Sequence, residues 1–75
     1  MLLSQIPEGE TLRILGFTGT RQLRRDLAQL GIQAGDIIRV HRHVPFGGPI
    51  LVEHCGTKVA LGRSLAARIR VEQVS

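Results

Sequence analysis

Apolar and polar residues alternate in several short stretches of the chain, which is the pattern of half-buried β-strands. In residues 11–17, Leu12 and Ile14 fall on one face, and Arg13 and Leu15 fall on the other. Similar stretches follow at residues 36–44, 50–55, 57–61 and 68–74. The pattern therefore predicts five short strands joined by tight turns.

A helical period replaces this alternation after the first predicted strand. The apolar stripe recurs at i, i+4 and i+7 and consists of Leu23, Leu27 and Leu30. Thr20 is a suitable N-cap for this helix. Gly31 occupies the C′ position, where a left-handed backbone costs glycine little, and Ile32 can fold back against Leu27 in a Schellman ending. Residues 62–67 predict a single helical turn before the last strand.

Short antiparallel strands favour a closed or nearly closed barrel, because closure removes exposed sheet edges. We therefore expect residues 1–75 to form a single, mainly β domain. Its predicted architecture is a small SH3-like five-stranded barrel with one inserted α-helix and a short helical turn before the last strand. The single cysteine, Cys55, excludes an internal disulfide, so packing alone must hold this small fold together.

The composition favours a cytoplasmic protein. No apolar run approaches the roughly 20 residues that cross a bilayer. The N-terminus lacks the basic start and long apolar segment of a secretory signal. Free Cys55 fits a reducing compartment. We expect a soluble protein that does not insert into a membrane.

The chain is basic, with a net charge of +4, and nearly all of its cations are arginines. Such a balance suits nucleic acid, an anionic membrane surface or an acidic protein face. Arg21, Arg24 and Arg25 crowd the start of the predicted helix, where the helix dipole disfavours cations, which hints that a partner uses them. The chain has no Trp or Tyr to stack on bases, which argues against nucleic acid.

The segment from Pro45 to Pro49 is a turn rich in glycine and proline that carries Phe46, one of only two aromatic residues. An aromatic residue exposed on a rigid turn beside basic side chains is typical of a protein–protein contact. The alternative is a loop tip that folds down over the mouth of the barrel.

The sequence contains no convincing catalytic constellation or phosphate-binding motif, which predicts a protein that is not an enzyme. His41 and His43 are expected on one strand face, a spacing at which two imidazoles can share a metal ion. Cys55 or Glu53 would have to complete that site from the neighbouring strand. The alternative is a basic, solvated strand face. His54 is expected on the core face as a packed histidine with one hydrogen bond.

Three segments taken in order resemble the FeoA family, the small cytoplasmic proteins of bacterial and archaeal ferrous-iron uptake. They are LRRDLAQLGIQAGD (23–36), RVHRHVPFGGPILVE (39–53) and KVALGRSLAARIRVE (58–72). Phe46 stands where the family usually has leucine or valine, and His54 where it usually has an aliphatic residue. The resemblance implies an SH3-like fold and a role in support of FeoB, the membrane ferrous-iron transporter with a cytoplasmic GTPase domain. It implies no catalytic residues.

The sequence thus predicts a non-enzymatic accessory protein that docks on the cytoplasmic part of a FeoB-like transporter and modulates iron(II) uptake. We expect this partner to recruit it to the inner face of the membrane. The candidate contact residues are Arg21, Arg24, Arg25, Phe46, Gly47, Gly48 and Pro49. No cofactor is required. Two alternatives stay open: a metal-binding or iron-sensing module that holds iron or zinc weakly through His41, His43 and Cys55, and a basic nucleic-acid-binding barrel. The oligomeric state is left open.

Overall fold

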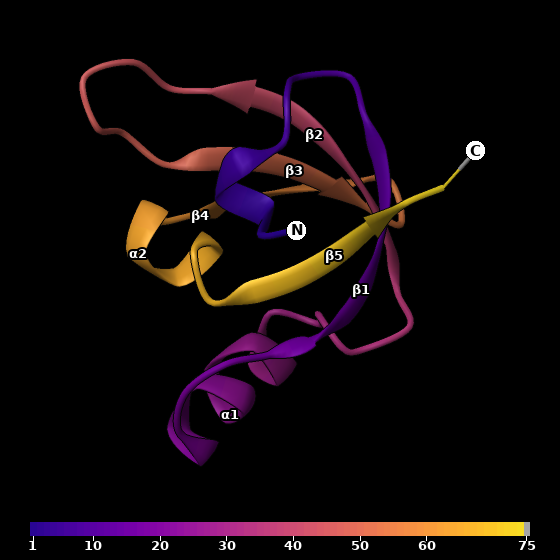
Figure 1. The fold of residues 1–75 in the computed structure, drawn as a ribbon, viewed down its shortest axis with the longest axis vertical. Coiled ribbons are helices and arrows are strands. Elements are labelled where there is room, and N and C mark those ends of the chain that lie inside the picture. The colour runs from indigo at the N-terminus through magenta and orange to yellow at the C-terminus, as the bar shows by residue number, and fades with distance from the viewer. Residues whose placement is uncertain (75) are drawn as a thin grey trace.

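The computed structural model describes residues 1–74, which form five strands and three short helices (Figure 1). The strands are β1 (Thr11–Phe17), β2 (Ile37–His43), β3 (Ile50–His54), β4 (Thr57–Leu61) and β5 (Ile69–Gln73). The helices are η1 (Leu3–Gln5), a 3₁₀ helix, α1 (Arg21–Gln29) and α2 (Arg63–Ala66). Among residues 1–74, no helix has the length and apolar character needed to span a membrane.

All five strands belong to one antiparallel sheet in the order β4-β3-β2-β1-β5. The predicted fold class is confirmed: the fold is mainly β, with one helix inserted between β1 and β2 and a helical turn before β5. Within residues 1–74 the barrel is not closed by strand pairing, because β4 and β5 remain the two edges of the sheet. The N-terminus covers the β5 edge instead, since Leu2 pairs with Arg70 and the Val71 amide donates to the Met1 carbonyl at 2.8 Å.

The hydrophobic core draws side chains from every strand and helix and contains no buried polar side chain among residues 1–74. Its members are Leu3, Ile6, Leu12, Ile14, Leu27, Ile32, Ile38, Val40, Ile50, Val52, Leu61, Ala66, Ile69 and Val71. The alternation of residues in the strands puts one side of each strand into this core. The N-terminal η1 packs against β5 and α2 on the inner side of the curved sheet (Figure 1).

The end of α1 has the geometry that the sequence predicts. The Ile32 amide donates to the Leu27 carbonyl at 2.9 Å, and the Gly31 amide donates to the Ala28 carbonyl at 2.9 Å. Gly31 has φ +80°, and both Leu27 and Ile32 are buried. These two hydrogen bonds and the apolar contact define a Schellman ending.

The rest of the predicted helix pattern is only partly confirmed. Leu23 is half-buried, but Leu30 is exposed, because α1 ends at Gln29 and the chain turns away at Leu30. Thr20 occupies the N-cap position with an extended backbone, but its side chain makes no capping hydrogen bond. A single buried leucine, Leu27, therefore attaches α1 to the core from within the helix.

Replacement of Gly31 by alanine is expected to lower the free energy of unfolding by about 1 kcal/mol, because a Cβ disfavours the left-handed backbone. No heavy atom lies within 4 Å of a Cβ built at Gly31, so the cost is conformational and not steric. Gly62→Ala is the matched control, because Gly62 also has free space but a φ of −59°. Urea unfolding measures both variants, and equal destabilisation of the two would contradict this account.

Candidate functional site

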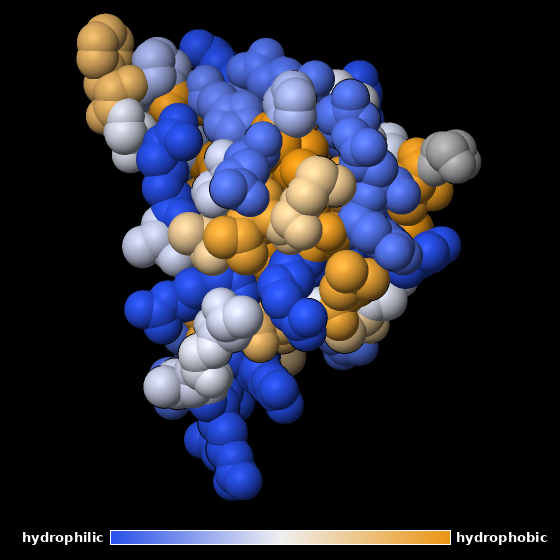
Figure 2. Space-filling model, in the orientation of Figure 1, coloured by the Kyte–Doolittle hydropathy of each residue, from blue (hydrophilic) through white to orange (hydrophobic). Residues whose placement is uncertain are grey.

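The two regions that the sequence nominates as partner contacts lie at opposite ends of the molecule. The β2–β3 loop that carries Phe46 is at one end of the long axis, and α1 is at the other (Figure 1). Figure 2 shows an apolar projection where the β2–β3 loop lies and a strongly hydrophilic surface where α1 lies. The fold therefore keeps the aromatic and arginine regions apart.

The base of the β2–β3 loop is held by three hydrogen bonds. The Val44 amide donates to the Pro49 carbonyl at 3.0 Å, and the Gly48 amide donates to the Pro45 carbonyl at 3.2 Å. The Arg63 guanidinium, at the start of α2, donates to the Val44 carbonyl at 3.2 Å. These bonds, together with two prolines of fixed φ, make the loop a rigid platform.

Phe46 is fully exposed at the tip of this platform. Its φ is +61° and that of Gly47 is +75°, so two successive residues are left-handed, as in the turns that favour Asn-Gly. A Cβ at Gly48 would lie 2.5 Å from Cγ1 of Val44, so a side chain cannot be placed there without movement. Phe46 does not fold down over the sheet, and the loop displays its ring to solvent in a backbone conformation that is costly for a bulky residue.

Arg21, Arg24 and Arg25 are all exposed on α1. Within residues 1–74, Arg13 is the one arginine or lysine with a carboxylate within 4 Å, at 3.0 Å from Glu72. The first turn of α1 contains no acidic residue, and the Asp26 carboxylate accepts instead from the Gln22 amide group at 3.0 Å. The three arginines therefore lie toward the positive end of the helix dipole without an anionic partner in the described part of the chain.

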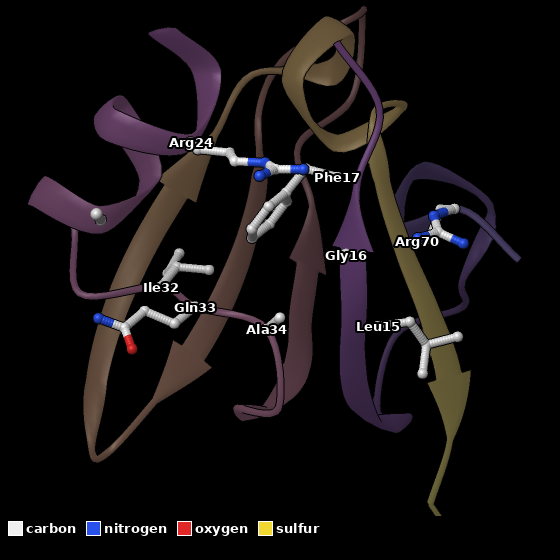
Figure 3. A pocket seen from close by; sticks show the side chains of 9 residues that line it. Leu15, Gly16, Phe17, Arg24, Ile32, Gln33, Ala34 and Arg70 are labelled. Atoms are coloured by element: carbon white, nitrogen blue, oxygen red, sulfur yellow. The ribbon is translucent and has the colours of Figure 1, made fainter. Parts of the chain in front are cut away.

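A cleft of about 460 Å³ opens between α1, the α1–β2 connection and the ends of β1 and β5 (Figure 3). Its apolar lining consists of Leu15, Phe17, Ala28, Ile32 and Ala34. Its polar lining consists of Arg24, Gln33 and Arg70. One of the predicted contact residues, Arg24, thus belongs to a concave site that also includes residues outside the prediction.

Arg70 and Arg24 border this cleft from different elements. A Cβ at Gly16 would lie 2.7 Å from Nη2 of Arg70, so the missing side chain lets the Arg70 guanidinium lie across β1. Arg24 extends from α1 toward Phe17, and Gly16 and Phe17 lie between the two arginines (Figure 3). One sign of this site is visible in the sequence, where Leu15 is an apolar residue on the polar face of β1.

The residues proposed as metal ligands are not brought together. Val40 pairs with Val52 and Arg42 with Leu51, so His41 is the extra residue of a β-bulge. The bulge shifts the alternation and separates His43 from His41, correcting the expectation that they share a face. His43 pairs with Ile50 at the start of β3. Cys55 follows the other end of this strand, about 16 Å from Ile50 at the usual rise per residue. Within residues 1–74, no group of three or more His, Cys, Asp or Glu residues could hold a metal ion.

The histidines that lie near the core instead make structural hydrogen bonds. His43 Nε2 lies 2.6 Å from the Ile6 carbonyl, which ties β2 to the N-terminal segment. His54 Nε2 lies 3.2 Å from Oδ2 of Asp36, whose carboxylate also accepts from the Gln33 amide at 2.8 Å. The expected role of His54 as a packed histidine with a hydrogen bond agrees with this arrangement, which secures the connection that lines the cleft.

The comparisons with known proteins agree on one family. A model described as the FeoA domain matches residues 1–73. The crystal structure of an iron uptake regulatory protein (FeoA) is similar with a TM-score of 0.90 and 28% identity, over 99% of this chain and 97% of that one. The solution structure of the FeoA protein from Chlorobium tepidum is similar with a TM-score of 0.89 and 29% identity, over 100% of this chain and 71% of that one.

The same fold also occurs as part of a longer regulator. The manganese regulator SloR is similar with a TM-score of 0.89 and 20% identity, over 99% of this chain but 34% of that one. This likeness shows the fold alone. None of the curated proteins matches the chain.

Replacement of Phe46 by glycine is expected to raise the free energy of unfolding by about 0.5–1 kcal/mol, because glycine relieves the left-handed strain. The ring buries no surface, so its removal costs no packing. Phe46→Ala is the control that keeps a Cβ, and its stability should stay within about 0.5 kcal/mol of the wild type. A marked loss of stability in both variants, measured by urea unfolding, would mean that the ring packs on the fold.

Proposed function

The chain belongs to the FeoA family, and on that premise we propose that it is a non-enzymatic accessory protein that binds the cytoplasmic part of a FeoB-type transporter and modulates iron(II) uptake. Family membership supports an accessory role in ferrous-iron transport. In the proposal, the protein acts in the cytoplasm and reaches the inner face of the membrane through its partner.

The observation that carries the proposal is the display of Phe46. The loop holds this residue in a left-handed conformation and exposes its whole ring, although the fold gains nothing from an aromatic side chain there. A fully buried phenylalanine contributes about 1.5–3 kcal/mol, which a partner with a matching pocket recovers on binding. A rigid loop also loses little conformational entropy when it binds. Phe46, flanked by Gly47, Gly48 and Pro49, therefore suits the anchor of a protein–protein contact.

The arginines of α1 suit a different task. Arg21, Arg24 and Arg25 are exposed and have no carboxylate within 4 Å in the part of the chain that the structure describes. Exposed charges at the rim of a contact mainly raise the association rate and set orientation. An acidic surface on the transporter's cytoplasmic part would complement them.

Titration against the purified cytoplasmic domain of the FeoB-like protein from the same organism tests the proposal. Saturable binding is expected, and Phe46→Ala should weaken it by at least about tenfold, the equivalent of 1.4 kcal/mol. Ile37→Ala is the matched control, because Ile37 is another exposed apolar residue, at the opposite end of β2 from the loop. Absence of binding, or equal affinities of Phe46→Ala and the wild type, would overturn the proposal.

The same titration should distinguish the contribution of the α1 arginines from that of Phe46. Arg21→Glu and Arg25→Glu are expected to slow association and to reduce its dependence on salt, with a smaller effect on dissociation. Stopped-flow measurements at low and physiological ionic strength check this. Association rates that match the wild type at both ionic strengths would remove the arginines from the contact.

A further inference from the structure

The cleft at the α1 end of the molecule has the size and lining of a binding site. Its volume of about 460 Å³ falls within the usual range of ligand pockets, about 300–1,000 Å³. Leu15 and Phe17 come from β1, and Ile32 comes from the chain that leaves α1. Leu15 is 44% exposed, which leaves a large aliphatic side chain in water on an otherwise polar strand face. Ile32 is already buried, but burial of Leu15 and of the exposed part of Phe17 is a favourable contribution that the free protein does not use.

Two cations border the same cleft, and no acidic residue lines it. Arg24 projects from α1, and Arg70 lies across Gly16 from β5 (Figure 3). Both are exposed, and neither has a carboxylate within 4 Å among residues 1–74. Their guanidinium groups present planar pairs of donors that match a carboxylate.

Apolar lining and flanking arginines together define one kind of occupant. A phosphate or free carboxylate alone would leave Leu15 and the exposed part of Phe17 in contact with water. A purely aliphatic segment would desolvate two guanidinium groups without a partner, which is unfavourable. A peptide with an apolar side chain between acidic residues satisfies both the lining and the cations.

We propose that this cleft binds an extended peptide segment in which one apolar side chain is flanked on both sides by carboxylates. The apolar side chain lies against Leu15, Phe17 and Ile32, while Arg24 and Arg70 each pair with a carboxylate. The inference rests on the proposed function in one respect, namely that the segment belongs to the cytoplasmic part of the transporter. It adds a second, chemically distinct contact to the one made by Phe46.

The test uses the full chain and a fluorescein-labelled nine-residue peptide with leucine at its centre and aspartate or glutamate on both sides. Fluorescence anisotropy should show saturable binding. Replacement of the acidic residues by serine, or of the central leucine by glycine, should each weaken binding by at least tenfold. Displacement by inorganic phosphate at the concentration of the peptide would overturn the proposal, since it would mean that the arginines alone bind.

Variants of the protein locate the site. Arg24→Glu and Arg70→Glu are each expected to weaken the peptide at least tenfold. Arg42→Glu is the matched control, because Arg42 is an exposed arginine of β2 that does not line the cleft. Gly16→Ala is a subtler probe, because the three heavy atoms nearest to its Cβ all belong to the guanidinium end of Arg70, which the substitution would displace while the fold survives. Near-wild-type binding by Arg24→Glu and Arg70→Glu, or an equal loss in Arg42→Glu, would overturn the assignment.

The outcome for the cleft is separable from that for the transporter contact. Transporter binding that depends on Phe46 but not on Arg24, Arg70 or Gly16, with no peptide bound, would overturn the cleft proposal and leave the proposed function standing. Peptide binding that depends on the two arginines, without binding to the transporter domain, would support the chemistry of the cleft and overturn the assigned partner.

Discussion

The turn that ends α1 is the constraint on which the rest of the structure depends. The hydrogen bond from the Ile32 amide to the Leu27 carbonyl, 2.9 Å long, reverses the chain and buries both side chains. The chain then runs beside β1, where the Gly35 amide donates to the Ile14 carbonyl at 2.7 Å. The turn thus fixes the helix to the core, starts β2 in register and places Ile32 in the wall of the cleft. Without it, Arg24 would have no fixed position relative to β5.

Local patterns sufficed to predict the strands, the helix and this turn. Apolar residues with a period of 2 indicate a strand, those with a period of 3.6 indicate a helix, and a glycine after a leucine indicates a helix end. Each of these patterns depends only on residues that are close in the sequence. The cleft was not accessible in the same way. Leu15 and Arg70 come together only when β1 and β5 pair, and the role of Gly16 depends on a guanidinium from another strand. The β-bulge at His41 is similar: one extra residue reverses the alternation that was expected to put His41 and His43 together.

Comparison with the two-residue β3–β4 turn shows how the loop at Phe46 differs from ordinary turn chemistry. The β3–β4 turn consists of Cys55 and Gly56, with φ values of +51° and +78°. The β2–β3 loop places Phe46 and Gly47 in the same region of backbone space, and the residue other than glycine again comes first. Asparagine or glycine would satisfy either turn at lower cost. Cys55 is small, but Phe46 is a large apolar side chain fully exposed to water. The proposed contact with the transporter accounts for a side chain that the fold itself does not use.

The separation of the aromatic and arginine ends limits how they can act together. The longest dimension of the fold is 29 Å, whereas charges are screened over about 8 Å at physiological ionic strength. In the proposal, the arginines of α1 therefore orient only what approaches that end, and Phe46 anchors only what reaches the other. A partner that engages both ends binds more tightly, because once the first contact has formed the second takes place at a high effective concentration. Each contact can then be weak and reversible by itself, while a partner that presents both surfaces at the right separation is bound selectively.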